Sequence, residues 1–351
     1  MKICFFGIYD PTYSRNDILI SGLKSAGGEV IECQADWRDK NRYKILYKKL
    51  QSIKNECDVI YAAYPAPVPA IFAKMFTRKP VVMDALYPMF DAVVNDRKEI
   101  PWFYPRAIKL WLYDWISALV SDCIIVDTNE HGKYWTKLPF IKKSKIKTIY
   151  LGFQEKIFFP TLHKRSDTNF LVGFYGVFNP LQGVPKIIET AHLLRNHADI
   201  QFRIIGSGRV SPLVDALMDK YNLKNVERVD RVPIEKLKEY CDEADVILGI
   251  FGDTEKARRV VPNKVYQGLA LKKPVITMDS PAEREIFSDN DIMLVQNNPE
   301  ALAEAILKLK NNADLREKIA ENGYNKVVEK YSSKPLGREL FNLIEVVISQ
   351  Q

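Results

Sequence analysis

Short apolar runs rich in β-branched residues alternate with segments of helical spacing from the first residues of the chain almost to its end. Runs that are apolar at nearly every position predict strands buried on both faces, and the segments between them predict helices. A strand, a helix and a parallel strand form a right-handed crossover, so a long series of crossovers builds a parallel sheet with helices on both faces. The sequence therefore predicts the α/β fold class with doubly wound, Rossmann-like sheets.

The alternation is interrupted once, at the polar stretch 151–169, which holds the charged run 163–167. The chain has 351 residues, more than one hydrophobic core usually serves. We therefore expect two Rossmann-like domains, 1–160 and 161–330, that face each other across a cleft. A terminal helix within 331–351 is expected to pack back on the first domain. The expected strands span 2–7, 29–33, 58–63, 80–85, 123–127 and 146–150, then 170–176, 200–206, 226–229, 246–251, 274–278 and 292–295.

The net charge limits the classes of partner. The chain carries 51 Lys and Arg against 44 Asp and Glu, a net charge of +7. An excess of positive charge favours an anionic partner, which is a nucleotide, a phospholipid or a nucleic acid. The sequence has no recognition-helix motif and no aromatic β-sheet signature, so a nucleic-acid partner is not expected.

The sequence indicates a cytoplasmic protein without a metal centre. Its N-terminal apolar run is too short for a secretory signal and lacks a cleavage site. Five scattered cysteines are expected to be buried thiols in a reducing compartment, and no cluster of Cys and His suggests a metal. No run of 18 uncharged apolar residues occurs, so a membrane-spanning helix is not expected.

Cations gather between the strand expected at 246–251 and the helix that follows it. Arg258 and Arg259 lie in the loop, Asn263 is positioned to cap the helix, and Lys264 falls in its first turn. The first turn of a helix has unpaired backbone N–H groups and a partial positive charge, so a lysine there is favourable only beside an anion. The pattern predicts a phosphate site; the alternative is a loop of solvated charges.

Residues 262–276 read Pro-Asn-Lys-Val-Tyr-Gln-Gly-Leu-Ala-Leu-Lys-Lys-Pro-Val-Ile. This segment resembles the donor-binding helix of nucleotide-sugar glycosyltransferases with the GT-B fold, those of family 4 (group 1). The resemblance implies a retaining, metal-independent hexosyltransferase. It also implies a nucleoside diphosphate sugar, linked to UDP or GDP, as the donor, with no further cofactor. Further segments resemble the same family: 127–131, 151–153, 158–160, 176–191 and 202–208.

The resemblance assigns Lys264 to the donor diphosphate and Gln267 to the ribose hydroxyls, where the family usually has a glutamate. Family members often carry an arginine and a lysine at the positions of Val177 and Gln182, beside Gly183. Two cations are therefore missing from the expected diphosphate site.

The loop after the strand at 246–251 offers candidate residues for the diphosphate and for the donor sugar. Arg258 and Arg259 are expected to replace the missing cations, and Asp253, or Glu255 in its place, is expected to contact the donor sugar. The departures from the family pattern leave two alternatives open. One is a catalytically silent protein that binds sugar nucleotides, and the other is a GT-B sugar-nucleotide epimerase.

The segment Gly206-Ser207-Gly208-Arg209 follows an expected strand and precedes a helix, as phosphate-binding loops do. The resemblance puts Gly206, Gly208 and Arg209 near the nucleotide and makes Arg231 a contact to the base. The alternative is a tight turn that requires two glycines.

In the first domain, four residues follow expected strands. Gly7 would let the backbone approach a ligand, and Arg15 would reach a phosphate, unless their segment is a simple β–α turn. Asp84 would orient or deprotonate an acceptor hydroxyl, or else only cap the next segment. His131, four residues after Asp127, would contact sugar or phosphate, as the resemblance implies, or else be a lone surface histidine.

The aromatic segment 101–115 contains Arg106 and Lys109 one helical turn apart. With the basic segments 38–54 and 137–147 it would form a surface that suits an anionic membrane, at about 1 kcal/mol per well-placed cation. The alternative is an aromatic helix core with solvated lysines. On the membrane interpretation, the protein lies peripherally on the inner face of the membrane and its hydroxyl acceptor is a lipid-linked or surface-glycan precursor.

Overall fold

The computed structural model describes residues 1–161 and 169–350 and divides into two compact units. Unit 1 consists of Met1–Gly152 and Tyr331–Gln351, and unit 2 consists of Phe153–Lys330. The sequence suggested a boundary at 160/161, whereas the chain passes between units at Gly152 and Phe153. The charged run 163–167, used above to find the boundary, lies outside the described residues.

Unit 1 is built on a six-stranded sheet, with all strands parallel, in the order β2-β1-β3-β4-β5-β6. Its inner strands are fully buried, because helices cover both faces. The strands are β1 (Lys2–Gly7), β2 (Glu29–Gln34), β3 (Val59–Ala62), β4 (Val81–Asp84), β5 (Cys123–Val126) and β6 (Ile146–Thr148). The helices are α1 (Ser14–Ser25), α2 (Arg42–Ile53), α3 (Pro67–Phe76), η1 (Asp91–Asp96), α4 (Pro105–Val120), α5 (Asn129–Thr136), η2 (Lys143–Lys145) and α13 (Ser333–Ser349).

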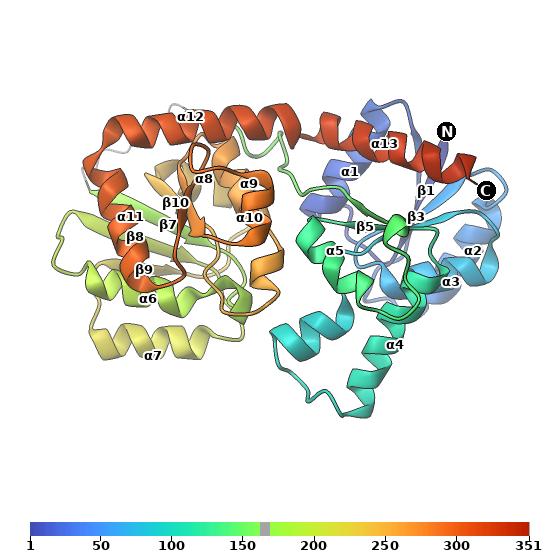
Figure 1. Ribbon diagram of the computed structural model, residues 1–351, viewed down its shortest axis with the longest axis horizontal. Coiled ribbons are helices and arrows are strands. Elements are labelled where there is room, and N and C mark those ends of the chain that lie inside the picture. Colours follow the sequence, from blue (N-terminus) through green and yellow to red (C-terminus); the bar gives the residue numbers. More distant parts are fainter. Residues whose placement is uncertain (162–168, 351) are drawn as a thin grey trace. The chain divides into compact units, whose positions relative to one another are not determined.

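The last helix of the chain, α13, packs along α1 (Figure 1). Gly22 and Gly337 lie at the crossing, where a Cβ on Gly22 would come within 2.7 Å of the Cα of Gly337. The face of α13 that carries Leu336, Leu340 and Ile344 is buried. Two glycines thus allow the two helix backbones to approach closely, and the C-terminal residues become part of unit 1.

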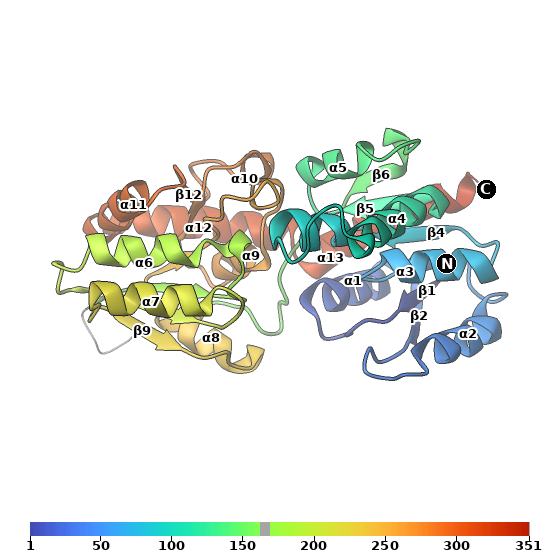
Figure 2. The same ribbon diagram turned by 90° about the horizontal axis from the view of Figure 1, so that it is seen from below.

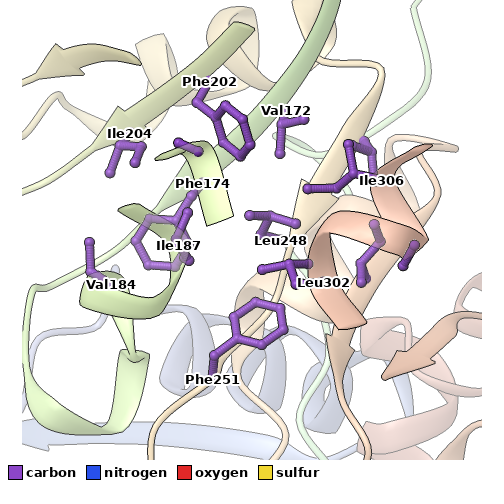
Figure 3. Packing of buried hydrophobic residues seen from close by; sticks show 14 of the residues in the cluster. Val172, Phe174, Val184, Ile187, Phe202, Ile204, Leu248, Phe251, Leu302 and Ile306 are labelled. Atoms are coloured by element: carbon purple, nitrogen blue, oxygen red, sulfur yellow. The ribbon is translucent and has the colours of Figure 1, made fainter. Parts of the chain in front are cut away.

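Unit 2 repeats this architecture with the strand order β12-β11-β10-β7-β8-β9. The ten labelled side chains in Figure 3 belong to its core, which packs between the sheet and helices on its faces. The strands are β7 (Phe170–Tyr175), β8 (Ile200–Ile205), β9 (Val226–Val229), β10 (Val246–Leu248), β11 (Val275–Met278) and β12 (Met293–Val295). The helices are η3 (Pro180–Gln182), α6 (Val184–Leu193), α7 (Ser211–Tyr221), α8 (Ile234–Glu243), η4 (Ala257–Arg259), α9 (Asn263–Ala270), α10 (Pro281–Ile286), α11 (Pro299–Asn311) and α12 (Ala313–Lys330).

The strand orders confirm the predicted α/β class with two doubly wound sheets. In each sheet the direction of winding reverses once, between β1 and β3 in unit 1 and between β7 and β10 in unit 2. Ligands of open α/β sheets bind at the carboxyl ends of the strands beside such a reversal. The loops that follow these four strands are therefore the first places to look for a site.

All five cysteines are buried and unpaired, as predicted. Within residues 1–161 and 169–350 no helix combines the length and apolar character needed to cross a membrane.

Candidate functional site

In unit 2 the loops after β7 and β10 lie against each other at the reversal of the sheet. The N–H of Phe251 donates to the carbonyl of Gln182 at 3.1 Å, and the N–H of Gly252 donates to the carbonyl of Leu181 at 3.2 Å. Gly183 adopts φ +67, and a Cβ there would overlap the backbone of Phe251. A glycine is therefore required for the two loops to meet, and Gln182 and Gly183 both lie at this junction.

Lys264 extends from the first turn of α9 to the end of β7. Its side chain is only 5% exposed, and its Nζ donates to Oε1 of Gln182 and lies 3.7 Å from the ring centroid of Phe174. A Cβ on Gly176, which has φ +153, would lie 3.0 Å from this Nζ. The glycine after β7 thus leaves room for the ammonium group.

The ammonium group of Lys264 lacks a counter-charge. Within the part of the chain that the structure describes, Lys264 makes no ion pair, and burial lowers the pKa of this lysine well below 10.5. A buried cation whose contacts are one amide oxygen and aromatic faces is unfavourable unless an anion joins it. A diphosphate at the amino end of α9 would supply that charge.

Gln267 lies one turn further along α9 and is also 5% exposed. Its Oε1 accepts a hydrogen bond of 3.0 Å from the hydroxyl of Tyr175. Burial raises the pKa of Tyr175, so the phenol keeps its proton. Tyr175 fixes the orientation of the Gln267 amide, which has both a donor and an acceptor atom for sugar hydroxyls.

Asn263 does not cap α9. The helix begins at Asn263 itself, after Pro262 in extended conformation, and Oδ1 of Asn263 is buried without a hydrogen-bond partner. The expected cap was wrong by one position because Pro262 takes the place before the first helical residue. The amide of Asn263 instead lies beside Lys264 in the first turn, with an acceptor atom that no group in the described part of the chain uses.

Arg258 and Arg259 lie in η4, within the loop after β10. Nε of Arg259 donates to the carbonyl of Glu255 at 3.0 Å, and Arg258 is exposed. The pKa of Asp279 is lowered by its partner Arg284 and further by the charge of Arg258, so Arg258 acts electrostatically on the residue that follows β11.

Asp253, in the same loop, is 79% exposed and forms an ion pair of 2.5 Å with Nζ of Lys186. It also accepts a bond of 3.2 Å from Nδ2 of Asn297. This carboxylate is therefore oriented towards α6 and the end of β12.

The glycines after β8 are needed for packing. A Cβ on Gly206 would overlap the carbonyl oxygen of Gly176, and one on Gly208 would lie 2.6 Å from the carbonyl oxygen of Phe178. The loop after β8 can thus lie directly on the loop after β7. This contact favours the tight-turn interpretation of the two glycines, while Arg209 and Arg231 are exposed beyond β8 and β9.

Arg228, at the end of β9, was not predicted as a site residue. Its guanidinium lies over the ring of Phe178, 4.5 Å from the centroid, and donates to the carbonyl of Val229 at 2.7 Å. This cation lies next to the loop that follows β7. No local pattern indicates this residue, because it belongs to a strand and its neighbour Phe178 is 50 positions earlier.

In unit 1, Arg15 and Asp84 form a buried ion pair. Nε of Arg15 lies 3.0 Å from Oδ2 of Asp84, and the hydroxyl of Tyr61 donates to the same oxygen at 2.9 Å. Arg15 also donates to the carbonyls of Ile149 and Tyr150 at 2.8 and 2.9 Å. The side chains of Arg15 and Asp84 are 2% and 0% exposed, so this geometry favours a structural role over contact with phosphate or acceptor.

His131 is fully buried, which excludes the surface interpretation. Its Nδ1 lies 2.5 Å from Oδ1 of Asp127, and its backbone N–H bonds the hydroxyl of Thr128, which caps α5. Within residues 1–161 and 169–350, Nε2 of His131 has no hydrogen-bond partner. The carboxylate thus orients the ring of this buried histidine. Gly7, at the end of β1, adopts φ +151 and has only ordinary contacts around it.

Residues 154–326 match the family model of the glycosyl transferases group 1. An uncharacterized glycosyltransferase of Methanocaldococcus jannaschii is 27% identical over 231 residues, which cover 58% of this chain and 60% of that protein. A poly(ribitol-phosphate) alpha-N-acetylglucosaminyltransferase of Staphylococcus aureus is 25% identical over 193 residues, which cover 51% of this chain and 36% of that protein. The chain thus spans 60% or less of the length of these relatives.

The crystal structure of HepE from Anabaena in complex with UDP-glucose has the same fold. It matches with a TM-score of 0.75 at 13% identity, over 99% of this chain and 100% of that chain.

Proposed function

Because residues 154–326 match the family model of the group 1 glycosyl transferases and the two-domain fold is that of HepE, we propose that this protein transfers a sugar from a nucleoside diphosphate to a hydroxyl acceptor. The observation that carries this proposal is the buried Lys264 at the reversal of the second sheet. Its uncompensated ammonium group, the amino end of α9 and the glycine after β7 together form a place for a diphosphate.

The proposed reaction develops charge where Lys264 can stabilise it. The bond between the anomeric carbon and the diphosphate oxygen breaks, and a bond from that carbon to the acceptor oxygen forms. The leaving diphosphate gains negative charge, and the acceptor hydroxyl gives up its proton to the departing phosphate oxygen. Lys264 and the first-turn N–H groups of α9 would stabilise the leaving group, because they are already in place where its negative charge develops.

Lys264 also gives the donor step a pH dependence. Since burial lowers the pKa of the free lysine, binding of a diphosphate should raise it again and draw a proton from solvent. Arg258 and Arg259 would approach the phosphates from the loop after β10. Gln267 and the free oxygen of Asn263 would contact the donor's sugar hydroxyls.

UDP is the first candidate for the donor nucleotide, with GDP second. HepE binds UDP-glucose in a fold of the same class, and the resemblance of residues 262–276 to family 4 implies either nucleotide. Retention of configuration and independence from metal ions are proposed on the same resemblance.

The acceptor is proposed to be a lipid-linked or surface-glycan precursor, met by a protein bound peripherally to the inner face of the membrane. The aromatic turn before α4 supports this. Trp102, Phe103 and Tyr104 are 73%, 61% and 51% exposed, and Arg106 and Lys109 follow on the helix. Exposed aromatic rings beside cations suit the interface of an anionic bilayer.

The test is a thermal-shift panel of UDP, GDP, ADP, TDP and CMP, followed by transfer assays with the nucleotide sugars of whichever base binds. A ligand at about 100 times its Kd stabilises the fold by about 2.7 kcal/mol. We expect one diphosphate to stabilise the wild type and Lys264→Ala to abolish the shift. Lys236→Ala, an exposed lysine of α8, is the matched control and should keep it. Equal shifts in both variants would refute the proposed site.

A catalytically silent sugar-nucleotide-binding protein is the second candidate. The neutral residue Gln182 favours it, because family members often carry a cation at this position. Here Oε1 of Gln182 accepts a hydrogen bond from Nζ of Lys264. Binding of a nucleotide sugar without hydrolysis or transfer, over hours and with mixed acceptors, would select this candidate.

A further inference from the structure

A groove of about 1040 Å³ opens in unit 1 at the end of the sheet opposite to the candidate residues. Its walls are the ends of α2 and α3, the segments that lead into β3 and β4, and Ile348 of α13. Figures 1 and 2 show α2, α3 and the end of α13 at the same end of this unit. Gly7, Asp84 and His131 follow the strands at the other edge, so the groove is separate from them.

Four cations line the groove, namely Lys54, Lys74, Arg78 and Lys79, against one lining carboxylate, Asp58. Oδ2 of Asp58 accepts the backbone N–H of Lys2. Lys74 is paired with Asp122 at 2.7 Å. Within the described residues, Lys54, Arg78 and Lys79 form no ion pair.

Positive charge is crowded beside the groove as well. The pKa of Lys145 is lowered by burial and by the charges of Lys74 and Lys142, against the opposing effect of Asp122. The carboxyl ends of helices supply about half a negative charge each, and those of α2, α3, α4 and α13 lie on this edge. Lys142 and Lys145 together with the four lining cations make six positive charges. Asp58, Asp122 and the four helix ends supply about four negative charges, so an excess of positive charge remains.

The charge of the whole chain points to the same unit. Unit 1 carries 25 Lys and Arg against 18 Asp and Glu, which is a net charge of +7, whereas unit 2 carries 26 of each and is neutral. The donor nucleotide proposed for unit 2 therefore leaves the net charge of the protein unexplained. An anionic partner of unit 1 would explain it.

From the groove and its cations we infer that unit 1 has a second binding site, for a soluble polyphosphate chain. Four cations spread along one groove suit several linked phosphates better than a single one. The groove is concave, and its aromatic residues Tyr47 and Phe76 pack edge to face at 5.0 Å within the wall. An extended polyphosphate lying along the groove would place successive phosphates beside Lys54, Arg78 and Lys79.

The experiment titrates sodium tripolyphosphate into the full chain by calorimetry. Because tripolyphosphate would also occupy a diphosphate site, every variant is made in a Lys264→Ala background as well as in the wild type. The groove variant combines Lys54→Gln, Arg78→Gln and Lys79→Gln. The control variant removes the same charge from exposed positions outside the groove, with Lys40→Gln, Lys44→Gln and Lys137→Gln.

Binding should persist in the Lys264→Ala background, weaken at least tenfold in the groove variant and change less than twofold in the control. It should also weaken as sodium chloride rises from 50 to 300 mM. Tryptophan fluorescence checks the folding of unit 1 in each variant. Three outcomes overturn the inference: equal affinities of groove and control variants, binding that disappears with Lys264→Ala, and groove-dependent binding of anionic vesicles or of single-stranded DNA but not of polyphosphate.

Because this assay measures binding without sugar transfer, it does not depend on the proposed function. A protein without transferase activity can still bind polyphosphate in the groove, and an active transferase can lack the groove site.

Discussion

Replacement of Glu283 by glutamine is expected to remove a large pH dependence from the stability of unit 2. Glu283 lies on α10 and is fully buried. Its Oε1 accepts a bond of 3.2 Å from the hydroxyl of Thr277, and its Oε2 has no hydrogen-bond partner. Burial raises the pKa of this carboxyl from 4.5 to about 8. The folded protein therefore holds the proton at neutral pH.

The sign of the effect follows from the two pKa values. Between pH 4.5 and 8 the unfolded chain has released the proton of Glu283 while the folded chain keeps it. The free energy of unfolding therefore falls as pH rises through this window and is independent of this group above it. At about 1.4 kcal/mol per pH unit, the full loss is on the order of 5 kcal/mol. Glutamine does not titrate, so Glu283→Gln should avoid this loss.

The chain offers a way to observe unit 2 separately. All five tryptophans lie in unit 1, so their fluorescence reports the unfolding of that unit, whereas far-ultraviolet circular dichroism reports both. Urea unfolding at pH 5.5 and pH 8 should show a dichroism transition that moves to higher urea in Glu283→Gln, and moves further at pH 8. The fluorescence transition should not change.

Glu285→Gln is the matched control, since Glu285 is on the same helix and only partly buried. It should shift neither transition in a pH-dependent way. If the wild type and Glu283→Gln differ by the same amount at both pH values, or if the fluorescence transition carries the difference, the buried neutral carboxyl is not the cause.

Four further predictions concern the sites described above. Calorimetry of UDP binding across a pH series, in buffers of different ionisation enthalpy, should show proton uptake at a pH below 10.5 that is lost in Lys264→Arg, because an arginine keeps its proton. Gly183→Ala should destabilise unit 2 by more than about 1 kcal/mol in urea unfolding, since both φ +67 and the Phe251 backbone exclude a Cβ. Asp84→Ala should cost unit 1 about 3 to 5 kcal/mol, seen in tryptophan fluorescence, because it leaves the Arg15 charge buried alone. Trp102→Ser should reduce sedimentation with anionic vesicles several-fold, whereas Phe140→Ser, 87% exposed elsewhere on unit 1, should not.

The sheets could be predicted because most of their inner strands are apolar at almost every position, and each observed strand falls on an expected run. Two helices have weak local signals in the sequence. The helix α10 has only six residues, and α5 contains Gly132, which lowers helical propensity. The strand expected at 246–251 ends at Leu248, although Gly249 and Ile250 still form backbone hydrogen bonds with Ile276 and Met278.

The candidate site residues likewise include some whose position could be predicted from the sequence and some whose role could not. The position of Lys264 in the first turn of α9 was predictable, because it depends on neighbours in the sequence. The ion pair of Arg15 with Asp84 joins residues 69 positions apart, and no local pattern indicates it. A buried arginine and an arginine that binds phosphate look alike in sequence. Only the partners distinguish the two roles.

The distribution of charge changes how the net charge of the chain should be interpreted. Taken over the whole sequence, +7 favoured an anionic partner and agreed with a nucleotide donor. Unit 2, which contains the candidate donor residues, is neutral, and its affinity for a diphosphate would come mainly from the buried ammonium group of Lys264 and a helix end, with Arg258 and Arg259 approaching from the loop after β10. A short-range site of this kind is hardly affected by salt, because burial limits screening. The excess charge of unit 1 is exposed and long-ranged, so salt should weaken its partners and leave the donor site nearly unchanged. Measuring UDP and polyphosphate binding across one salt series would therefore separate the two sites without any mutation.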